Sequence, residues 1–189
     1  VCSSDLSFIN LSYMNTSEST TVAIDKRVPS DVNVARWLPE RLTNGGLMFA
    51  YNNDFLALGV EHWTMRNLTD AHYMFAGLSN FNGDLSKWEP SQLKIAYEMF
   101  KNCTAFEGRG LEKWAPYVTS IKEALGMFRN CTAFEGRGLA KWAPNVKSIN
   151  DAGDMFKNCQ SLKLENLKGW QLTHPLINVH SLLIDRKST

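Results

Sequence analysis

Asn102 to Pro116 reads NCTAFEGRGLEKWAP, and Asn130 to Pro144 reads NCTAFEGRGLAKWAP, so the two segments differ at one position. Their offset of 28 residues indicates a structural repeat. Units of this length are typical of proteins in which each repeat is one turn of a coil, too small to bury its apolar side alone. We therefore expect the chain to wind over itself, with equivalent positions of successive units stacked in columns.

Further copies of the pattern extend the repeat in both directions. The dipeptide Met-Phe recurs at spacings of 25 to 28 residues, beginning at Met48, Met74, Met99, Met127 and Met155. All six tryptophans share a second register: Trp37, Trp63, Trp88, Trp114, Trp142 and Trp170. An inward position stays inward in every unit, so we expect buried columns of Met, Phe and Trp. An exposed row of tryptophans that binds carbohydrate is the alternative, but the aliphatic residue three places before each of the last five favours the core.

The unit around Trp114 predicts a turn, a short strand, a second turn and a short helix. Gly108 and Gly110 bracket the first turn, and the strand is expected between Leu111 and Trp114. Apolar residues then recur every three to four places over 118–128, which is the spacing of a helix. Strands that recur once per unit in one direction pair in parallel. The predicted fold class is therefore an α/β solenoid, with a parallel sheet on one side and short helices on the other.

Composition limits the functional classes. The chain has 189 residues, of which 44% are hydrophobic, and a net charge of +1. This size allows one domain with a substantial core, and the balanced charge gives no reason to expect a nucleic-acid partner. The sequence contains no run of apolar residues long enough to span a membrane and no recognisable signal peptide.

The repeat array is predicted to occupy 37–171, between two caps. Residues 1–36 are expected to form the N-terminal cap, and 172–189 the C-terminal cap and tail, because the open ends of such an array need covering. The opening VCSSDL has two interpretations. Cys2 followed by two serines resembles the start of a mature lipoprotein, which would anchor the chain through that cysteine; alternatively, residues 1–6 are an artefactual remnant.

Three cysteines share one register, at Cys103, Cys131 and Cys159. Parallel Cβ vectors in such a column do not suit the S–S torsion, so we expect buried, reduced thiols. A metal site is not expected, because no histidine lies in phase with them and no Cys-x-x-Cys occurs.

The complete pattern, MF-x-NC-x-x-F-x-G-x-x-L-x-x-W, resembles the repeat of BspA-type leucine-rich-repeat surface proteins, a kind also frequent in mycoplasma lipoproteins. The resemblance implies a right-handed, leucine-rich-repeat-like coil, a cell-surface or extracellular location, and a role in adhesion. It does not imply a particular ligand. After the tryptophan, Ala115-Pro116-Tyr117-Val118 replaces the family's usual Asp-x-Ser-Asn-Val run.

Catalysis is not expected. None of the four histidines, His62, His72, His174 and His180, lies in a recognisable catalytic motif, and the sequence has no phosphate loop, nucleophile elbow or metalloprotease motif. We therefore predict a non-catalytic protein that needs no cofactor or metal.

Charged residues also recur in register and are the candidate ligand-binding surface. One basic residue follows each of the last three Met-Phe methionines by two places, and further charges recur in the turn and beyond it. The full set is Lys101, Arg129, Lys157, Glu107, Arg109, Glu135, Arg137, Lys113 and Lys141. One interpretation is a ridge that binds a host or matrix protein or an acidic glycan; the other is a solvated face whose repetition only records duplication. The predicted function is adhesion or protein or glycan binding by a monomer, the alternative is a structural spacer that carries another domain, and an enzyme of unknown type is a distant third.

Overall fold

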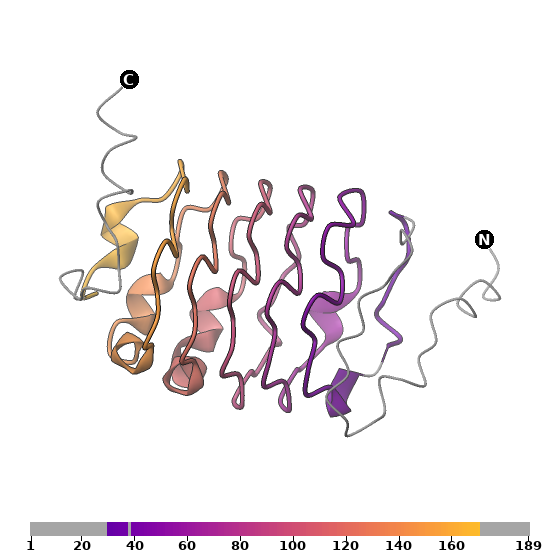
Figure 1. Ribbon diagram of the computed structural model, residues 1–189, viewed down its shortest axis with the longest axis horizontal. Coiled ribbons are helices and arrows are strands. Elements are labelled where there is room, and N and C mark those ends of the chain that lie inside the picture. The colour runs from indigo at the N-terminus through magenta and orange to yellow at the C-terminus, as the bar shows by residue number, and fades with distance from the viewer. Residues whose placement is uncertain (1–29, 38, 171–189) are drawn as a thin grey trace.

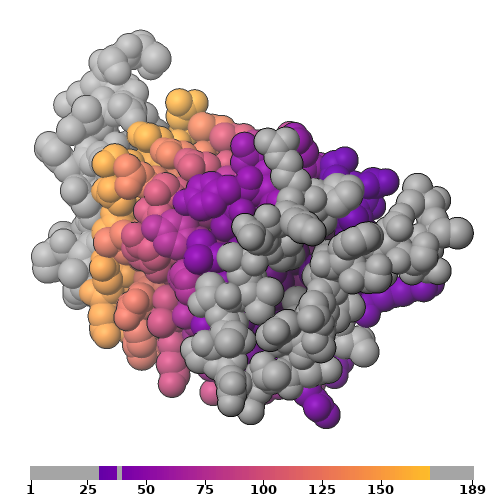
Figure 2. All heavy atoms as spheres, turned by 45° about the vertical axis from the view of Figure 1, so that its right-hand side comes forward, coloured from indigo at the N-terminus to yellow at the C-terminus, as the bar shows by residue number. Residues whose placement is uncertain are grey.

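The computed structural model describes residues 30–37 and 39–170, which form a row of windings side by side (Figure 1). A winding is here one repeat unit of 25 to 28 residues. Figure 2 shows the same succession on the molecular surface, from indigo to yellow. Most of the predicted N-terminal cap, Cys2, the predicted cap at 172–189, His174 and His180 lie outside the described residues.

The predicted α/β solenoid is wrong, and the leucine-rich-repeat architecture implied by the resemblance is wrong with it. Residues 30–37 and 39–170 contain no β-strand, no sheet and no α-helix. Their regular elements are six 3₁₀ helices: η3 (Pro39–Arg41), η4 (Val60–His62), η5 (Leu111–Ser120), η6 (Leu139–Trp142), η7 (Val146–Ser148) and η8 (Leu164–Leu167).

The predicted strand is part of a 3₁₀ helix, and most of the predicted helix is not helical. Leu111 and Trp114, assigned to a strand, lie in η5 and are both buried. A 3₁₀ helix has three residues per turn, so positions i and i+3 fall on the same side; that geometry turns both side chains inward. The segment after η5, assigned to a helix, instead makes backbone hydrogen bonds to the next winding.

Those bonds are concentrated around the Met-Phe dipeptides. In one winding, the amides of Ala71, Tyr73, Phe75 and Gly77 donate to carbonyl oxygens of the next winding at 2.8 to 2.9 Å. The same alternate-residue pattern recurs between the other windings. It yields only isolated parallel bridges: Asn44 with Asp70, Asp70 with Ile95, Ile95 with Glu123, and Glu123 with Asp151. A further bridge, Asn33 with Leu58, lies outside these segments.

Left-handed residues explain why these segments are not strands. Each winding has a positive φ one residue before the methionine and again three residues after it. Around Met99 these residues are Glu98, with φ 47°, and Asn102, with φ 64°. A strand needs consecutive residues in the β region, and two left-handed residues four places apart interrupt it. They also allow Met99 and Phe100, which are adjacent in sequence, both to point into the core.

The predicted tryptophan column is confirmed. The six tryptophans are at most 6% exposed, and successive indole rings stack with centroids 5.9 to 6.4 Å apart. The Nε1–H of Trp114 donates to the Leu85 carbonyl of the preceding winding at 3.2 Å. Equivalent bonds are made by Trp63, Trp88, Trp142 and Trp170. The column therefore joins the windings by hydrogen bonds as well as by apolar contact.

The cysteine column is confirmed as buried, free thiols. Each Sγ lies 3.0 Å from the carbonyl oxygen of a phenylalanine in the preceding winding: Cys103 from Phe75, Cys131 from Phe100 and Cys159 from Phe128. Burial raises the pKa of all three thiols. They are unreactive core residues rather than nucleophiles.

Candidate binding face

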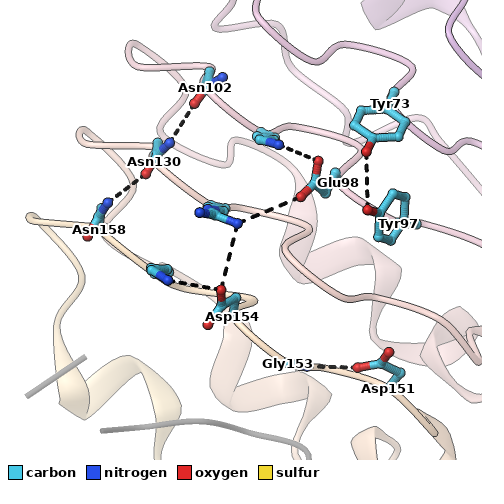
Figure 3. Close-up of polar contacts among 12 residues, drawn as sticks. Tyr73, Tyr97, Glu98, Asn102, Asn130, Asp151, Gly153, Asp154 and Asn158 are labelled. Atoms are coloured by element: carbon cyan, nitrogen blue, oxygen red, sulfur yellow. Dashed lines mark hydrogen bonds and ion pairs between the residues drawn. The ribbon is translucent and has the colours of Figure 1, made fainter. Parts of the chain in front are cut away.

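The Met-Phe segments present their other side chains on one face of the row of windings. Met and Phe point inward, and the basic residue that follows the Phe is 24 to 35% exposed in the last three segments. Two groups gather there (Figure 3): a charged cluster of Glu98, Lys101, Arg129, Asp154 and Lys157, and an aromatic pair, Tyr73 and Tyr97. We call this side of the molecule the Met-Phe face.

The structure brings the predicted basic column together and places acids between its members. Lys101 Nζ lies 2.6 Å from Glu98 Oε2, and Lys157 Nζ lies 3.2 Å from Asp154 Oδ2. Sequence analysis missed both acids, because their shared register, one place before each methionine, holds Leu47, Tyr73 and Gly126 in the other windings. The three like charges are thus separated and partly compensated by two carboxylates.

Glu98 is the most constrained member of the cluster. Only 4% of its side chain is exposed, and a buried carboxylate is costly unless it is paired. The ammonium group of Lys101 supplies that pairing. Removing Lys101 would leave a buried, uncompensated acid, so Lys101 has a structural role whatever else it does.

Arg129 differs from both lysines because no close contact satisfies it. Its Nη1 lies 4.0 Å from Glu98 Oε1 and 3.7 Å from Asp154 Oδ2, which is too far for a hydrogen bond. Its Nε is buried and has no hydrogen-bond partner among the described residues. The side chain is 33% exposed, so Arg129 is partly accessible and its contacts with the two acids are ion pairs without a hydrogen bond.

The aromatic pair lies beside Glu98 of the charged cluster (Figure 3). The Tyr73 hydroxyl donates to the Tyr97 hydroxyl at 3.1 Å, and the two rings meet edge to face with centroids 5.0 Å apart. Lys101 Nζ lies 5.8 Å from the centre of the Tyr73 ring. The bond to Tyr97, burial and the nearby Glu98 carboxylate raise the pKa of Tyr73. Tyr73 and Tyr97 do not share a register, so repetition gave no signal for the pair.

An asparagine ladder runs beside the cluster. Asn130 Nδ2 donates to Asn102 Oδ1 at 2.6 Å, and Asn158 Nδ2 donates to Asn130 Oδ1 at 2.8 Å. All three have positive φ, a conformation that asparagine tolerates better than most residues. The 28-residue spacing of these asparagines was visible in the sequence and would have predicted the ladder. It fixes the edge of the Met-Phe face.

The remaining predicted residues lie apart from the charged cluster. In the turns, Arg109 pairs with Glu107 at 3.2 Å and Arg137 pairs with Glu135 at 2.8 Å. Lys163 adds a second partner to Glu135 at 3.0 Å, and hydrogen bonds from Arg137 and Lys163 lower the pKa of Glu135 to about 2. Lys113 in η5 and Lys141 in η6 are exposed. Among the described residues, no ion pair links the six predicted residues of the turns and of η5 and η6 to the charged cluster.

Comparison with known proteins assigns a family. The family model described as "Mycoplasma protein of unknown function, DUF285" matches residues 19–142 and 111–186, nearly the whole chain. The chain belongs to this family. No curated protein and no solved structure matches it significantly. The family description states no activity.

Two histidines can be placed. His72 Nδ1 lies 2.7 Å from Asp70 Oδ1, which also accepts the His72 backbone amide at 3.0 Å; the contact thus closes a local turn. His62 is exposed and lies 3.6 Å from Glu61. Within the described ranges, no group of three or more His, Cys, Asp or Glu residues is arranged to hold a metal ion. In that same part of the chain, no helix has the length and apolar character needed to cross a membrane.

Proposed function

We propose that the protein is a non-catalytic binding protein, displayed at the cell surface or secreted, that recognises a host or matrix protein or a glycan through the Met-Phe face. The observation that carries the proposal is Arg129, a partly exposed residue whose side chain makes no hydrogen bond to the described residues, between two lysines that are each hydrogen-bonded to an acid. The likeness of the repeat to that of BspA-type surface proteins supports the surface location and the adhesive role.

Preorganisation supports the same proposal. Lys101 and Lys157 are held by acids on the same winding, and the Asn102–Asn130–Asn158 ladder fixes the adjacent edge. Groups already fixed in position lose little conformational entropy when a ligand binds. Arg and Tyr are also the residue types enriched at binding hot spots.

A structural spacer is the second candidate, and the bonded columns of side chains that join successive windings favour it. The Trp, Cys and Asn columns all bond one winding to the next, which would let the chain carry another domain without binding anything itself. Saturable binding by the isolated chain separates the two proposals.

Immobilised matrix proteins and glycans, probed with the purified chain by biolayer interferometry, provide that test. Reversing the charges of Lys101, Arg129 and Lys157 together is a poor test, because a change at Lys101 removes the closest partner of the buried Glu98 carboxylate and would destabilise the fold. The informative variant is Arg129→Gln with Lys157→Gln, and its matched control is Lys113→Gln with Lys141→Gln, which removes two exposed charges from η5 and η6. Binding lost only in the first variant supports the proposal, and absence of saturable binding across the panel rejects it in favour of the spacer.

A further inference from the structure

We infer that the ligand of the Met-Phe face is an acidic polysaccharide, with Arg129 as the residue that binds its carboxylate or sulfate groups and Lys101 and Lys157 on either side. This inference rests on the proposed function and specifies the ligand class.

Hydrogen-bond capacity decides the sign of the ligand. The Glu98 carboxylate is almost entirely buried and has Lys101 at 2.6 Å, so its capacity to accept is largely used within the protein. Arg129 is the reverse, since a guanidinium has five N–H donors and its side chain makes no hydrogen bond to the described residues. The unused capacity of the cluster is therefore donor capacity, which an anion satisfies and a cation does not.

The charge of the cluster agrees with that conclusion. Lys101, Arg129 and Lys157 outnumber Glu98 and Asp154, so the cluster has an excess positive charge. Guanidinium groups bind carboxylate and sulfate-like oxygens through paired, charge-assisted hydrogen bonds. Each lysine also keeps N–H donors beyond the one used in its ion pair.

Spacing favours a polysaccharide over an acidic peptide. The three basic residues occupy equivalent positions of successive windings, and the phenylalanine rings one place before them repeat at centroid distances of 5.7 and 5.8 Å. Side chains on one side of an extended peptide recur only every second residue, at about 6.8 Å. A sugar polymer with more than one anionic group per repeat presents its charges more closely. Tyr73, next to the cluster, adds an aromatic edge against which a sugar ring can pack.

Binding of defined polymers tests the inference directly. The probes are heparin, with sulfate and carboxylate groups; dextran sulfate, with sulfate only; hyaluronan, with carboxylate only; neutral dextran; and polyglutamate as an acidic polypeptide. We expect heparin or dextran sulfate to bind and neutral dextran not to bind. Arg129→Gln should weaken binding by at least about tenfold, the effect of losing one charge-assisted hydrogen bond, and Arg129→Lys should weaken it less. The Lys113→Gln, Lys141→Gln control should bind like the original protein.

The outcomes separate this inference from the proposed function. Hyaluronan and dextran sulfate distinguish carboxylate from sulfate as the anion. Binding of heparin or dextran sulfate supports the inference, whereas binding of hyaluronan alone, which has one carboxylate per disaccharide, overturns the spacing on which it rests. Binding to a panel protein without binding to any acidic polysaccharide overturns the inference and leaves the proposed function intact. Tighter binding of polyglutamate than of the polysaccharides, or an Arg129→Gln variant of unchanged affinity, also overturns it. Unchanged tryptophan fluorescence in each variant shows that the fold is retained, and Arg129→Lys provides a second reading if Arg129→Gln does not fold.

Discussion

Replacing Trp114 by phenylalanine tests whether the indole hydrogen bonds hold the windings together. Trp114 is fully buried between Trp88 and Trp142, at centroid distances of 5.9 and 6.4 Å. Phenylalanine keeps an aromatic ring in the column but removes the Nε1–H that donates to the Leu85 carbonyl. That carbonyl still accepts the Trp88 amide at 3.0 Å, so it is not left without a partner.

The expected loss combines two effects. The hydrogen bond contributes about 0.5 to 1.5 kcal/mol, and the smaller ring leaves a void whose cost adds to the lost apolar burial. We expect Trp114→Phe to lower the free energy of unfolding by about 2 to 3 kcal/mol. Trp114→Ala, which also removes the ring stacking, should lower it by about 3 to 5 kcal/mol.

Trp37 is the matched control. It is also buried, at 3% exposure, but its Nε1 has no hydrogen-bond partner among the described residues. Trp37→Phe removes a similar volume together with an unpaired buried donor, which itself costs about 1 to 3 kcal/mol. The loss of stability in Trp37→Phe should therefore be smaller than that in Trp114→Phe, and the difference between the two should be about 1 to 3 kcal/mol.

Urea unfolding, followed by fluorescence of the remaining tryptophans, measures both variants on one scale. Equal losses for Trp37→Phe and Trp114→Phe would refute the reasoning, because the hydrogen bond would then contribute nothing beyond ring packing. A larger loss at Trp37 would refute it more strongly.

Three further predictions concern the turn, the thiols and an ion pair. Gly110→Ala should destabilise the fold severely, because the φ of Gly110 is 86° and an added Cβ would lie 2.1 Å from the Ser86 amide nitrogen. Gly45→Ala is the control in the same urea assay: its Cβ would meet only side-chain atoms, the nearest at 3.2 Å, so the loss of stability should be smaller. Burial raises the pKa of Cys159 to about 12, whereas a thiol in the unfolded chain has a pKa of about 8.5. The contribution of the protonated Cys159 thiol to stability is therefore complete below pH 8.5 and falls by about 1.4 kcal/mol per pH unit from there up to about pH 12. Cys159→Ala should flatten this dependence of stability on pH. The Glu135 carboxyl should titrate near pH 2 by NMR, so its stabilising contribution is present above its unfolded pKa of about 4.3 and is lost as the pH falls through about 2; removing both Arg137 and Lys163 should return the pKa toward its ordinary value.

The core was predictable from the sequence because registers report which side of each winding faces inward. Trp114, Phe106 and Cys103 have counterparts one repeat later at Trp142, Phe134 and Cys131, and all six are buried. No knowledge of the backbone conformation was needed for that inference, since equivalent positions of stacked units share their surroundings.

The backbone conformation was not predictable by the same reasoning. Apolar spacing over 118–128 matched a helix, but a repeat of three to four residues also arises when left-handed residues turn adjacent side chains inward. Gly126 and Asn130, which have positive φ around Met127, were the available signals in that winding. Within one winding neither residue type is strong evidence for a positive φ. The evidence becomes stronger when Asn130 is compared with Asn102 and Asn158, which occupy the same position in the neighbouring windings.

The length of the repeat, its apolar columns and the common register of Lys101, Arg129 and Lys157 can be read from the amino-acid order alone. The 3₁₀ helices, the isolated bridges, the position of Glu98 and Asp154 between the basic residues, and the lack of a hydrogen bond from the Arg129 side chain to the described residues are visible only in the folded chain. Burial depends on position within one winding, whereas backbone angles, ion pairs and hydrogen bonds depend on which atoms of neighbouring windings meet.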